Sequence, residues 1–191
     1  MIRIDLPASE NDIRKLNVGD EVLLKGQIMT ARDMAHKYMV ESKPRYLHDI
    51  LNGSVIYHCG PVVKQARGKY EIVAAGPTTS IREEPYQGEV IALYKVRGVI
   101  GKGGMGPRTV EALRKYGAVY FSATGGLAPV LADAVKSVEK VYMLEEFGVP
   151  EAMWVLNVED LPVVVTMDSH GRSLHKGILD QSRAVFEKLI A

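Results

Sequence analysis

Short runs of apolar and alternating residues, separated by Gly, Pro and Asp, follow one another along most of the chain. Such runs predict β-strands, because successive side chains of a strand point to opposite faces of a sheet. Residues 2–6 alternate and are expected to form an edge strand. Further strands are predicted over residues 20–29, 54–57, 71–75, 98–100, 118–122 and 138–144, and as a pair over 153–158 and 161–167 around Glu159 and Asp160.

Capping residues and apolar spacing predict helices between these strands. Ser9 and Asp12 resemble an N-capping pair for a short helix through Leu16. Thr30 is expected to cap a helix over residues 31–40. Other helices are predicted over 88–95, 107–116 (opened by Pro107 and stopped by Gly117), 129–135 and 173–190, the last with an apolar face of Ile178, Leu179, Val185, Phe186 and Ile190.

Strands and helices alternate from Ser54 onward, which favours a mixed α/β core. The two N-terminal strands are hairpin-like and are expected to form a second sheet. We therefore predict an α/β protein of three layers, two of strands and one of helices, with residues 1–191 forming a single domain.

Composition narrows the class of protein. A hydrophobic content of 47% is ordinary for a soluble globular protein, and a net charge of +1 with no basic stripe argues against nucleic-acid binding. No stretch of apolar residues is long enough to span a membrane, and the N-terminus lacks the apolar core of a signal peptide. The lone cysteine, Cys59, permits neither an intrachain disulfide nor a metal site that needs several cysteines of this chain. We expect a cytoplasmic protein.

Two loops carry the chemistry that suits a small, oxygen-rich anion. Residues 76–82, GPTTSIR, offer the hydroxyls of two threonines and a serine, and the planar fork of Arg82 matches a carboxylate. Residues 101–106, GKGGMG, precede a helix whose N-terminus adds partial positive charge to that of Lys102. The alternative for both loops is a structural turn that binds nothing.

Three other features are weaker. Arg32 lies near a predicted helix start, where a basic group opposes the helix dipole, so it is expected to have another partner; the alternative is that Asp33 compensates its charge. GKGGMG fits the spacing of a dinucleotide-binding loop, but no acidic residue ends the strand that follows. His58 and Cys59 are neighbours on a strand and are therefore poorly placed to form a catalytic pair.

The chain resembles the β subunit of class I fumarate hydratase, the C-terminal domain of single-chain class I fumarases and the β subunit of L-tartrate dehydratase. The segments that carry the resemblance are, in order, GQIMTARDMAHKYM, IYHCGP, AAGPTTSIR, GVIGKGGMG and EAMWVLNVEDLPVVVTMD. It implies a swivelling β/β/α domain. It also implies a [4Fe-4S] cluster ligated by a partner α subunit and not by this chain, and an assembly of α–β pairs.

The resemblance assigns roles to matching residues. Thr78 falls on the threonine proposed as catalytic base, and Thr79 is its neighbour in the substrate-binding turn. Arg32 and Arg82 fall on arginines that bind substrate carboxylates, and Lys102 falls on a lysine that contacts substrate. The expected activity is the reversible hydration of fumarate to L-malate. L-Tartrate dehydration is the alternative substrate, and a non-catalytic anion-binding domain is the alternative of a different class.

Overall fold

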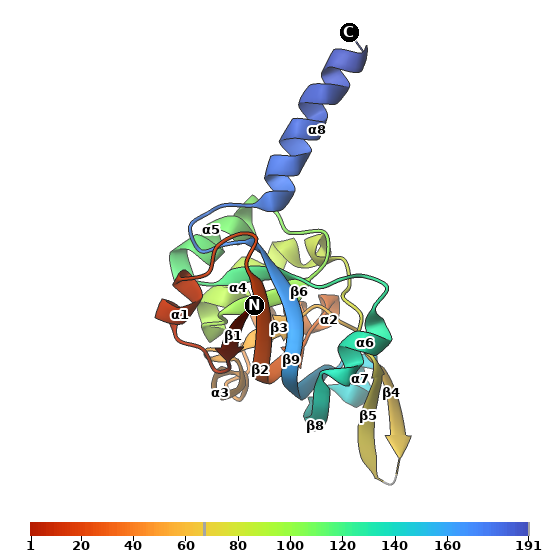
Figure 1. Cartoon of the computed structure of the whole chain (residues 1–191). Helices are drawn as coiled ribbons and strands as arrows, with labels where there is room; N and C mark the ends of the chain where they lie inside the picture. The colour runs from red at the N-terminus through yellow and green to blue at the C-terminus, as the bar shows by residue number, and fades with distance from the viewer. Residues whose placement is uncertain (67, 191) are drawn as a thin grey trace.

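The computed structural model describes residues 1–66 and 68–190 and has a mixed α/β architecture (Figure 1). Its strands are β1 (Ile2–Asp5), β2 (Glu21–Thr30), β3 (Val55–Tyr57), β4 (Val62–Ala66), β5 (Lys69–Ala74), β6 (Gly98–Gly101), β7 (Val119–Ser122), β8 (Val135–Tyr142) and β9 (Met153–Met167). Its helices are α1 (Glu10–Arg14), α2 (Asp33–Ser42), α3 (Leu47–Leu51), the 3-10 helix η1 (Ser80–Glu83), α4 (Glu84–Tyr94), α5 (Pro107–Tyr116), α6 (Ala128–Asp133), α7 (Leu144–Phe147) and α8 (Leu174–Ile190).

The main sheet has seven strands in the order β1-β2-β3-β6-β7-β9-β8, with an additional pairing of β2 with β9. The strands β2, β3, β6 and β7 run parallel, and β9 is antiparallel to both β2 and β7. Because β9 pairs with β2 as well as with β7, the strands β2, β3, β6, β7 and β9 form a closed ring of hydrogen-bonded strands. At its irregular point Gly26 has a φ of +114°, and a Cβ there would lie 2.5 Å from the Leu6 carbonyl oxygen, so only glycine fits.

Alternation along the ring strands divides the apolar side chains between two cores. Ile28, Tyr57 and Leu156 belong to the first core, and their neighbours Met29, Ile56 and Val155 belong to the second. The second core is completed by buried residues of the helices α2, α3, α4 and α5, whereas the first receives residues of α1 and α6. The burial of each large side chain contributes roughly 1.5–3 kcal/mol, so both cores fix the positions of the strand ends.

The edge position of β1 is confirmed, but the predicted hairpin of N-terminal strands is wrong. β1 and β2 are parallel and belong to the main sheet. The reason is α1, which lies between them and supplies the crossover that parallel neighbours require. Its predicted cap is confirmed, since the Asp12 amide donates to the Ser9 hydroxyl at 3.2 Å. The second sheet is instead the antiparallel pair β4–β5, of which only β5 is anticipated by the sequence.

Two other local predictions are wrong. Thr30 is the buried last residue of β2 and not a helix cap; its hydroxyl donates to the Ala152 carbonyl at 3.3 Å and accepts from the Trp154 amide at 3.0 Å. Residues 153–167 form one continuous strand and not a pair, because β2 pairs with residues on both sides of Asp160, whose φ is +54°. The helices α3 and α7 are also absent from the predicted elements.

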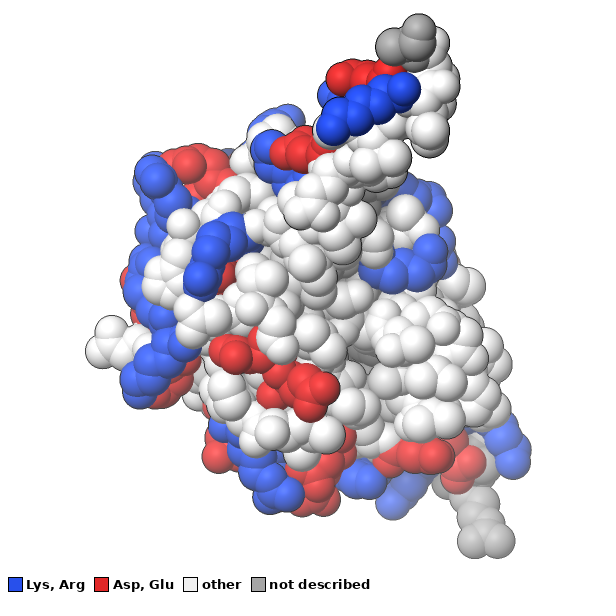
Figure 2. All heavy atoms as spheres, turned by 45° about the horizontal axis from the view of Figure 1, so that its top comes forward, with Lys and Arg blue, Asp and Glu red and all other residues white. Residues whose placement is uncertain are grey.

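The predicted C-terminal helix is confirmed as α8, but its apolar face is exposed, which the sequence does not predict. It projects from the body of the molecule (Figure 1) and has no buried residue. The side chains of its apolar face are exposed, Val185 to 58% and Leu189 to 79%. Charged side chains gather on one side of the projecting helix and leave the other side uncharged (Figure 2). Among the described residues no helix is long and apolar enough to cross a membrane.

Candidate active site

The two predicted anion loops lie side by side at the carboxyl ends of the parallel strands. The Thr78 amide donates to the His58 carbonyl beyond β3 at 2.7 Å, and the Lys102 amide beyond β6 donates to the Thr78 carbonyl at 3.2 Å. Thr79 and Lys102 form a parallel bridge. Ligands of α/β proteins commonly bind at this end of parallel strands, so the fold brings the loops to a position suited to a site.

The hydroxyls of the two threonines differ. The Lys102 ammonium donates to the Thr79 hydroxyl at 2.7 Å, which ties that cation to the first loop. The Thr78 hydroxyl is buried and has no hydrogen-bond partner among the described residues, and the same holds for the Arg32 Nε atom. A buried polar group without a partner is unfavourable by about 1–3 kcal/mol, so both are groups that a bound oxygen-rich molecule would satisfy.

Arg32 lies two residues beyond β2, at the N-cap position of α2, and its side chain is mostly buried. Its guanidinium is 3.2 Å from the Glu151 carboxylate, with the two side chains 20% and 16% exposed. A Cβ at Gly60 would lie 2.7 Å from the Arg32 Nη1 atom, so only glycine leaves room for the guanidinium. The ion-pair partner of Arg32 is therefore Glu151, while Asp33 also lies close enough for the charge of Arg32 to lower its pKa.

Asp33 instead pairs with Arg82. Burial raises the pKa of the Asp33 carboxyl, but hydrogen bonds from Glu83 and Arg82 and the charges of both arginines outweigh it and lower the pKa below its ordinary value. Burial and the neighbouring Asp33 raise the pKa of Glu83 to about 8. At neutral pH Glu83 is therefore mostly protonated and hydrogen-bonds to the Asp33 carboxylate.

A buried polar network lies beneath the loops. His36 and His58 both approach the Gln87 side-chain oxygen, at 2.9 and 2.8 Å. His58 Nδ1 is 2.8 Å from the Ser80 hydroxyl, and the Tyr120 hydroxyl donates to the same oxygen at 2.8 Å. Burial lowers the pKa of both imidazoles, so the network is electrically neutral at physiological pH.

The helix N-terminus after the glycine loop is not open to a ligand. Pro107 and Gly117 bound α5 as predicted, but the Glu84 carboxylate accepts from the amides of Gly106, Arg108 and Thr109 at 2.8, 3.0 and 3.2 Å. An internal carboxylate thus occupies the place that the sequence offered to a bound anion. Lys102 is the charged group that this loop retains for a ligand.

The chain's residues do not suit a metal cluster. Cys59 is buried in the first core, and burial raises the pKa of its thiol to about 12, whereas metals bind the thiolate. No group of three or more potential metal ligands occurs among the described residues. His58 lies in the polar network, so it and Cys59 are directed to opposite sides of the strand, as alternation predicts.

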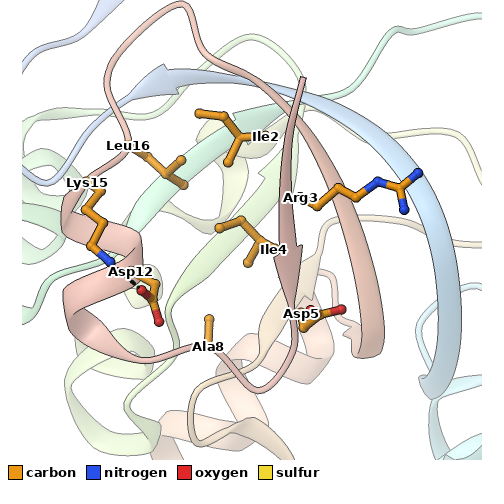
Figure 3. A pocket seen from close by; sticks show the side chains of 8 residues that line it. All are labelled: Ile2, Arg3, Ile4, Asp5, Ala8, Asp12, Lys15 and Leu16. Atoms are coloured by element: carbon orange, nitrogen blue, oxygen red, sulfur yellow. Dashed lines mark hydrogen bonds and ion pairs between the residues drawn. The ribbon is translucent and has the colours of Figure 1, made fainter.

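A hollow between β1 and α1 lies apart from these loops (Figure 3). It is lined by Ile2, Arg3, Ile4, Asp5, Ala8, Asp12, Lys15 and Leu16. Its apolar side chains lie toward one another, and Lys15 pairs with Asp12 at 2.8 Å. None of the predicted site residues lines this hollow, so it is not the candidate active site.

The structure thus joins Thr78, Thr79 and Lys102 by direct contacts, and it connects Arg82 to the segment of Arg32 through Asp33. Among the groups that hold these side chains in place, Glu83, Glu84, Gln87 and Glu151 are not indicated by the sequence, because long-range partners leave no local pattern. Asp33 and Ser80 also hold them, whereas the sequence indicates these two only as a charge partner of Arg32 and as a hydroxyl of the anion loop.

The comparisons with known proteins agree on one family. The family described as "Fumarase C-terminus" matches residues 1–178. The chain is 51% identical to the "Putative fumarate hydratase class I" of Geobacillus stearothermophilus, with 99% of this chain but 36% of that protein covered. It is 43% identical to the "Putative L(+)-tartrate dehydratase subunit beta" of Methanocaldococcus jannaschii (95% and 93% covered) and 39% identical to the "L(+)-tartrate dehydratase subunit beta" of Escherichia coli K12 (88% and 83% covered).

Proposed function

This chain belongs to the fumarase C-terminus family, and from that premise we propose that it is the β subunit of a hydro-lyase that interconverts fumarate and L-malate. The observation that carries the proposal is the arrangement at the strand ends: the Thr78 hydroxyl has no partner among the described residues, and it lies on the loop that Lys102 joins. Arg32 and Arg82 add two guanidiniums connected through the segment of Asp33.

The proposed division of labour follows from the charges. Fumarate and malate carry two carboxylates, and Arg32, Arg82 and Lys102 supply three cations for them. Removal of the malate proton builds negative charge on the adjacent carboxylate, and fixed cations stabilise that charge most in the transition state. Thr78 is proposed as the base that takes this proton, and Thr79 as a substrate contact positioned by Lys102.

Substrate binding would alter two existing ion pairs. Arg82 is paired with Asp33 and Arg32 with Glu151, so a substrate carboxylate must share or replace these acidic partners. The protonated state of Glu83 assists at the first pair, because it removes one negative charge from the neighbourhood of Arg82.

We assign the [4Fe-4S] cluster to a partner α subunit, since the lone thiol of this chain is buried and protonated. We propose a heteromer of α–β pairs in the cytoplasm, with no nucleic-acid partner. We also propose the swivelling β/β/α fold, which the two cores on either side of the strands support.

L-Tartrate is the second candidate substrate. Two relatives named as tartrate dehydratase β subunits are covered by this chain over 93% and 83% of their length, whereas the relative named as a fumarate hydratase is much longer than this chain. Both substrates are four-carbon dicarboxylates, so the same three cations would serve either one.

The test is to co-express this chain with a candidate cluster-bearing α subunit, reconstitute the complex anaerobically, and assay fumarate hydration beside tartrate dehydration. We expect fumarate hydration, and we expect Thr78→Ala to abolish it while Thr79→Ser retains most of it. Tartrate dehydration alone would change the substrate and leave the site residues standing. Activity on neither substrate, with the cluster assembled, would support the non-catalytic anion-binding alternative.

A further inference from the structure

The hydrogen-bond partners in the buried polar network determine which ring nitrogens of its histidines carry a hydrogen. His36 Nδ1 lies 2.9 Å from the Arg32 carbonyl oxygen, which can only accept a hydrogen bond. The Nδ1 atom must therefore carry a hydrogen. If His36 is neutral, its Nε2 has a lone pair and needs a donor.

The atom that faces His36 Nε2 is the Gln87 Oε1, which is also an acceptor. The same oxygen faces His58 Nε2, while the Gln87 amide nitrogen is buried with no partner among the described residues. Exchanging the amide oxygen and nitrogen of Gln87 resolves both problems, because one NH₂ group has two hydrogens for two imidazoles.

The alternative is a charged network. With the Gln87 oxygen between the rings, both imidazoles must carry Nε2–H, and His36 becomes an imidazolium inside the protein. His36, His58 and Gln87 are all fully buried. Of the carboxyl groups nearby, Asp33 faces His36 but is engaged with Arg82, and Glu83 is protonated at neutral pH. A buried cation without a close counter-ion is strongly unfavourable.

Each end of the network holds a segment of the candidate site. His36 binds the carbonyl of Arg32 itself. Ser80 lies between Thr79 and Arg82 in the turn, and a Cβ at Gly101 would lie 1.8 Å from the Ser80 hydroxyl, so this turn fits tightly against β6. The Tyr120 hydroxyl, bonded to Ser80, also lies against the start of the glycine loop, since a Cβ at Gly101 would lie 2.9 Å from it.

We infer that Gln87 is a positioning residue of the candidate site: its NH₂ group donates to Nε2 of both His36 and His58, and through these rings it sets the segments of Arg32 and Ser80 relative to each other. The functional part of this inference rests on the proposed function. The proton arrangement stands without it.

Nitrogen-15 NMR of the full chain with labelled histidine tests the arrangement directly. We expect His36 and His58 to be neutral Nδ1–H tautomers at neutral pH, with the exposed His170 as reference signal. An imidazolium at His36, or an Nε2–H tautomer at either ring near neutral pH, would overturn the inference.

Gln87→Glu separates positioning from simple space filling. A carboxylate can only accept, so it should draw hydrogens onto both Nε2 atoms and make His36 an imidazolium, which appears as a change in the nitrogen shifts. Unchanged shifts in this variant would contradict the inference. Gln27→Glu is the matched control: it removes one hydrogen bond to the Ile50 carbonyl and touches neither ring. If Gln87→Glu does not fold, the tautomers measured in the wild-type chain still test the proposed proton arrangement.

The assembled enzyme gives the functional readout. We expect Gln87→Met, which fills similar space without hydrogen bonds, to raise KM about 10-fold or more, with a smaller change in kcat, because the segments that carry Arg32 and Arg82 are no longer aligned. An unchanged KM in a folded variant would refute the positioning role. Inactivity of the wild-type complex on both substrates would instead refute the proposed function and leave the NMR result intact.

Discussion

Arg32 and Arg82 both act on the Asp33 carboxylate, yet they lie in different surroundings. Arg32 is 20% exposed, confined by Gly60 and paired with Glu151. Arg82 is 53% exposed and pairs with Asp33 at the surface of the 3-10 helix. One guanidinium is held by packing, and the other by an ion pair that solvent screens.

Two residues of the same type therefore need not contribute equally to stability and to activity. A packed guanidinium loses little side-chain entropy when a carboxylate binds it, whereas an exposed one must be ordered at that moment. We therefore expect changes around Arg32 to affect folding and activity together, and changes at Arg82 to affect mainly activity. Four variants test this comparison, in descending order of their expected effect on the free energy of unfolding.

Gly60→Ala should have the largest effect. The new methyl group would lie 2.7 Å from the Arg32 Nη1 atom and 2.8 Å from the Pro150 carbonyl oxygen, and such overpacking costs about 1–3 kcal/mol. Displacement of Arg32 should also lower kcat/KM by about 100-fold. Denaturant unfolding and steady-state kinetics measure the two effects. Gly88→Ala is the control, since its Cβ would meet neighbours only at 3.5 Å and beyond.

Arg32→Met should follow. It keeps the volume of the side chain but leaves the Glu151 carboxylate, 16% exposed, without its counter-ion, so we expect a loss of about 1–2 kcal/mol in unfolding free energy. The double variant Arg32→Met with Glu151→Gln should recover part of this stability without recovering activity. If the double variant is no more stable than the single one, the pair does not stabilise the fold.

Glu83→Gln should change how stability depends on pH. Below about pH 4.5, the ordinary value for this carboxyl, Glu83 is protonated in folded and unfolded chains alike; above that, the unfolded chain releases the proton while the folded chain holds it until about pH 8. Stability therefore falls as pH rises through this window. The glutamine variant should show a smaller fall between pH 5 and pH 8 in urea titrations. Equal slopes would mean that Glu83 is ionised at neutral pH.

Arg82→Ala should have the smallest effect on folding, about 0.5 kcal/mol or less, because its ion pair is exposed. Its effect on activity should be large, since a charge-assisted contact of roughly 1.5–3 kcal/mol to substrate is lost, which corresponds to about 10- to 100-fold in kcat/KM. An unchanged kcat/KM would remove Arg82 from the site.

The sequence predicts the parts of this molecule that depend on neighbours along the chain. Ser9 caps α1, Pro107 and Gly117 bound α5, and the hydroxyls and lysine of the two loops lie where local turns place them. Contacts between residues that are distant in the sequence could not be predicted in this way. Glu84 binds the helix N-terminus that the glycine loop was expected to leave open, and this was not predictable because a carboxylate 22 residues away leaves no trace in the sequence of the loop.

The same limit explains the strand pairing and the acidic partners of the site. Residues 153–167 read as two strands because Glu159 and Asp160 resemble a turn, but β2 continues to pair across them. Arg32 is paired with a residue of another segment, Glu151, and not with its neighbour in sequence. The candidate site residues are predicted from their chemistry and from the family resemblance, whereas the groups that orient them required the fold.

Because α8 projects from the body of the molecule, it should unfold independently of the sheet. Its 17 residues extend over about 25 Å, and its first turn contacts the body through His175, which hydrogen-bonds to Thr166 at 2.9 Å and packs against the ring of Tyr120. A helix of this length is marginally stable in water when its apolar face is not packed. Its backbone amides beyond residue 180 should therefore exchange with deuterium within seconds, while those of β9 remain protected until the whole sheet unfolds. In the isolated chain α8 is a separate unit of cooperativity.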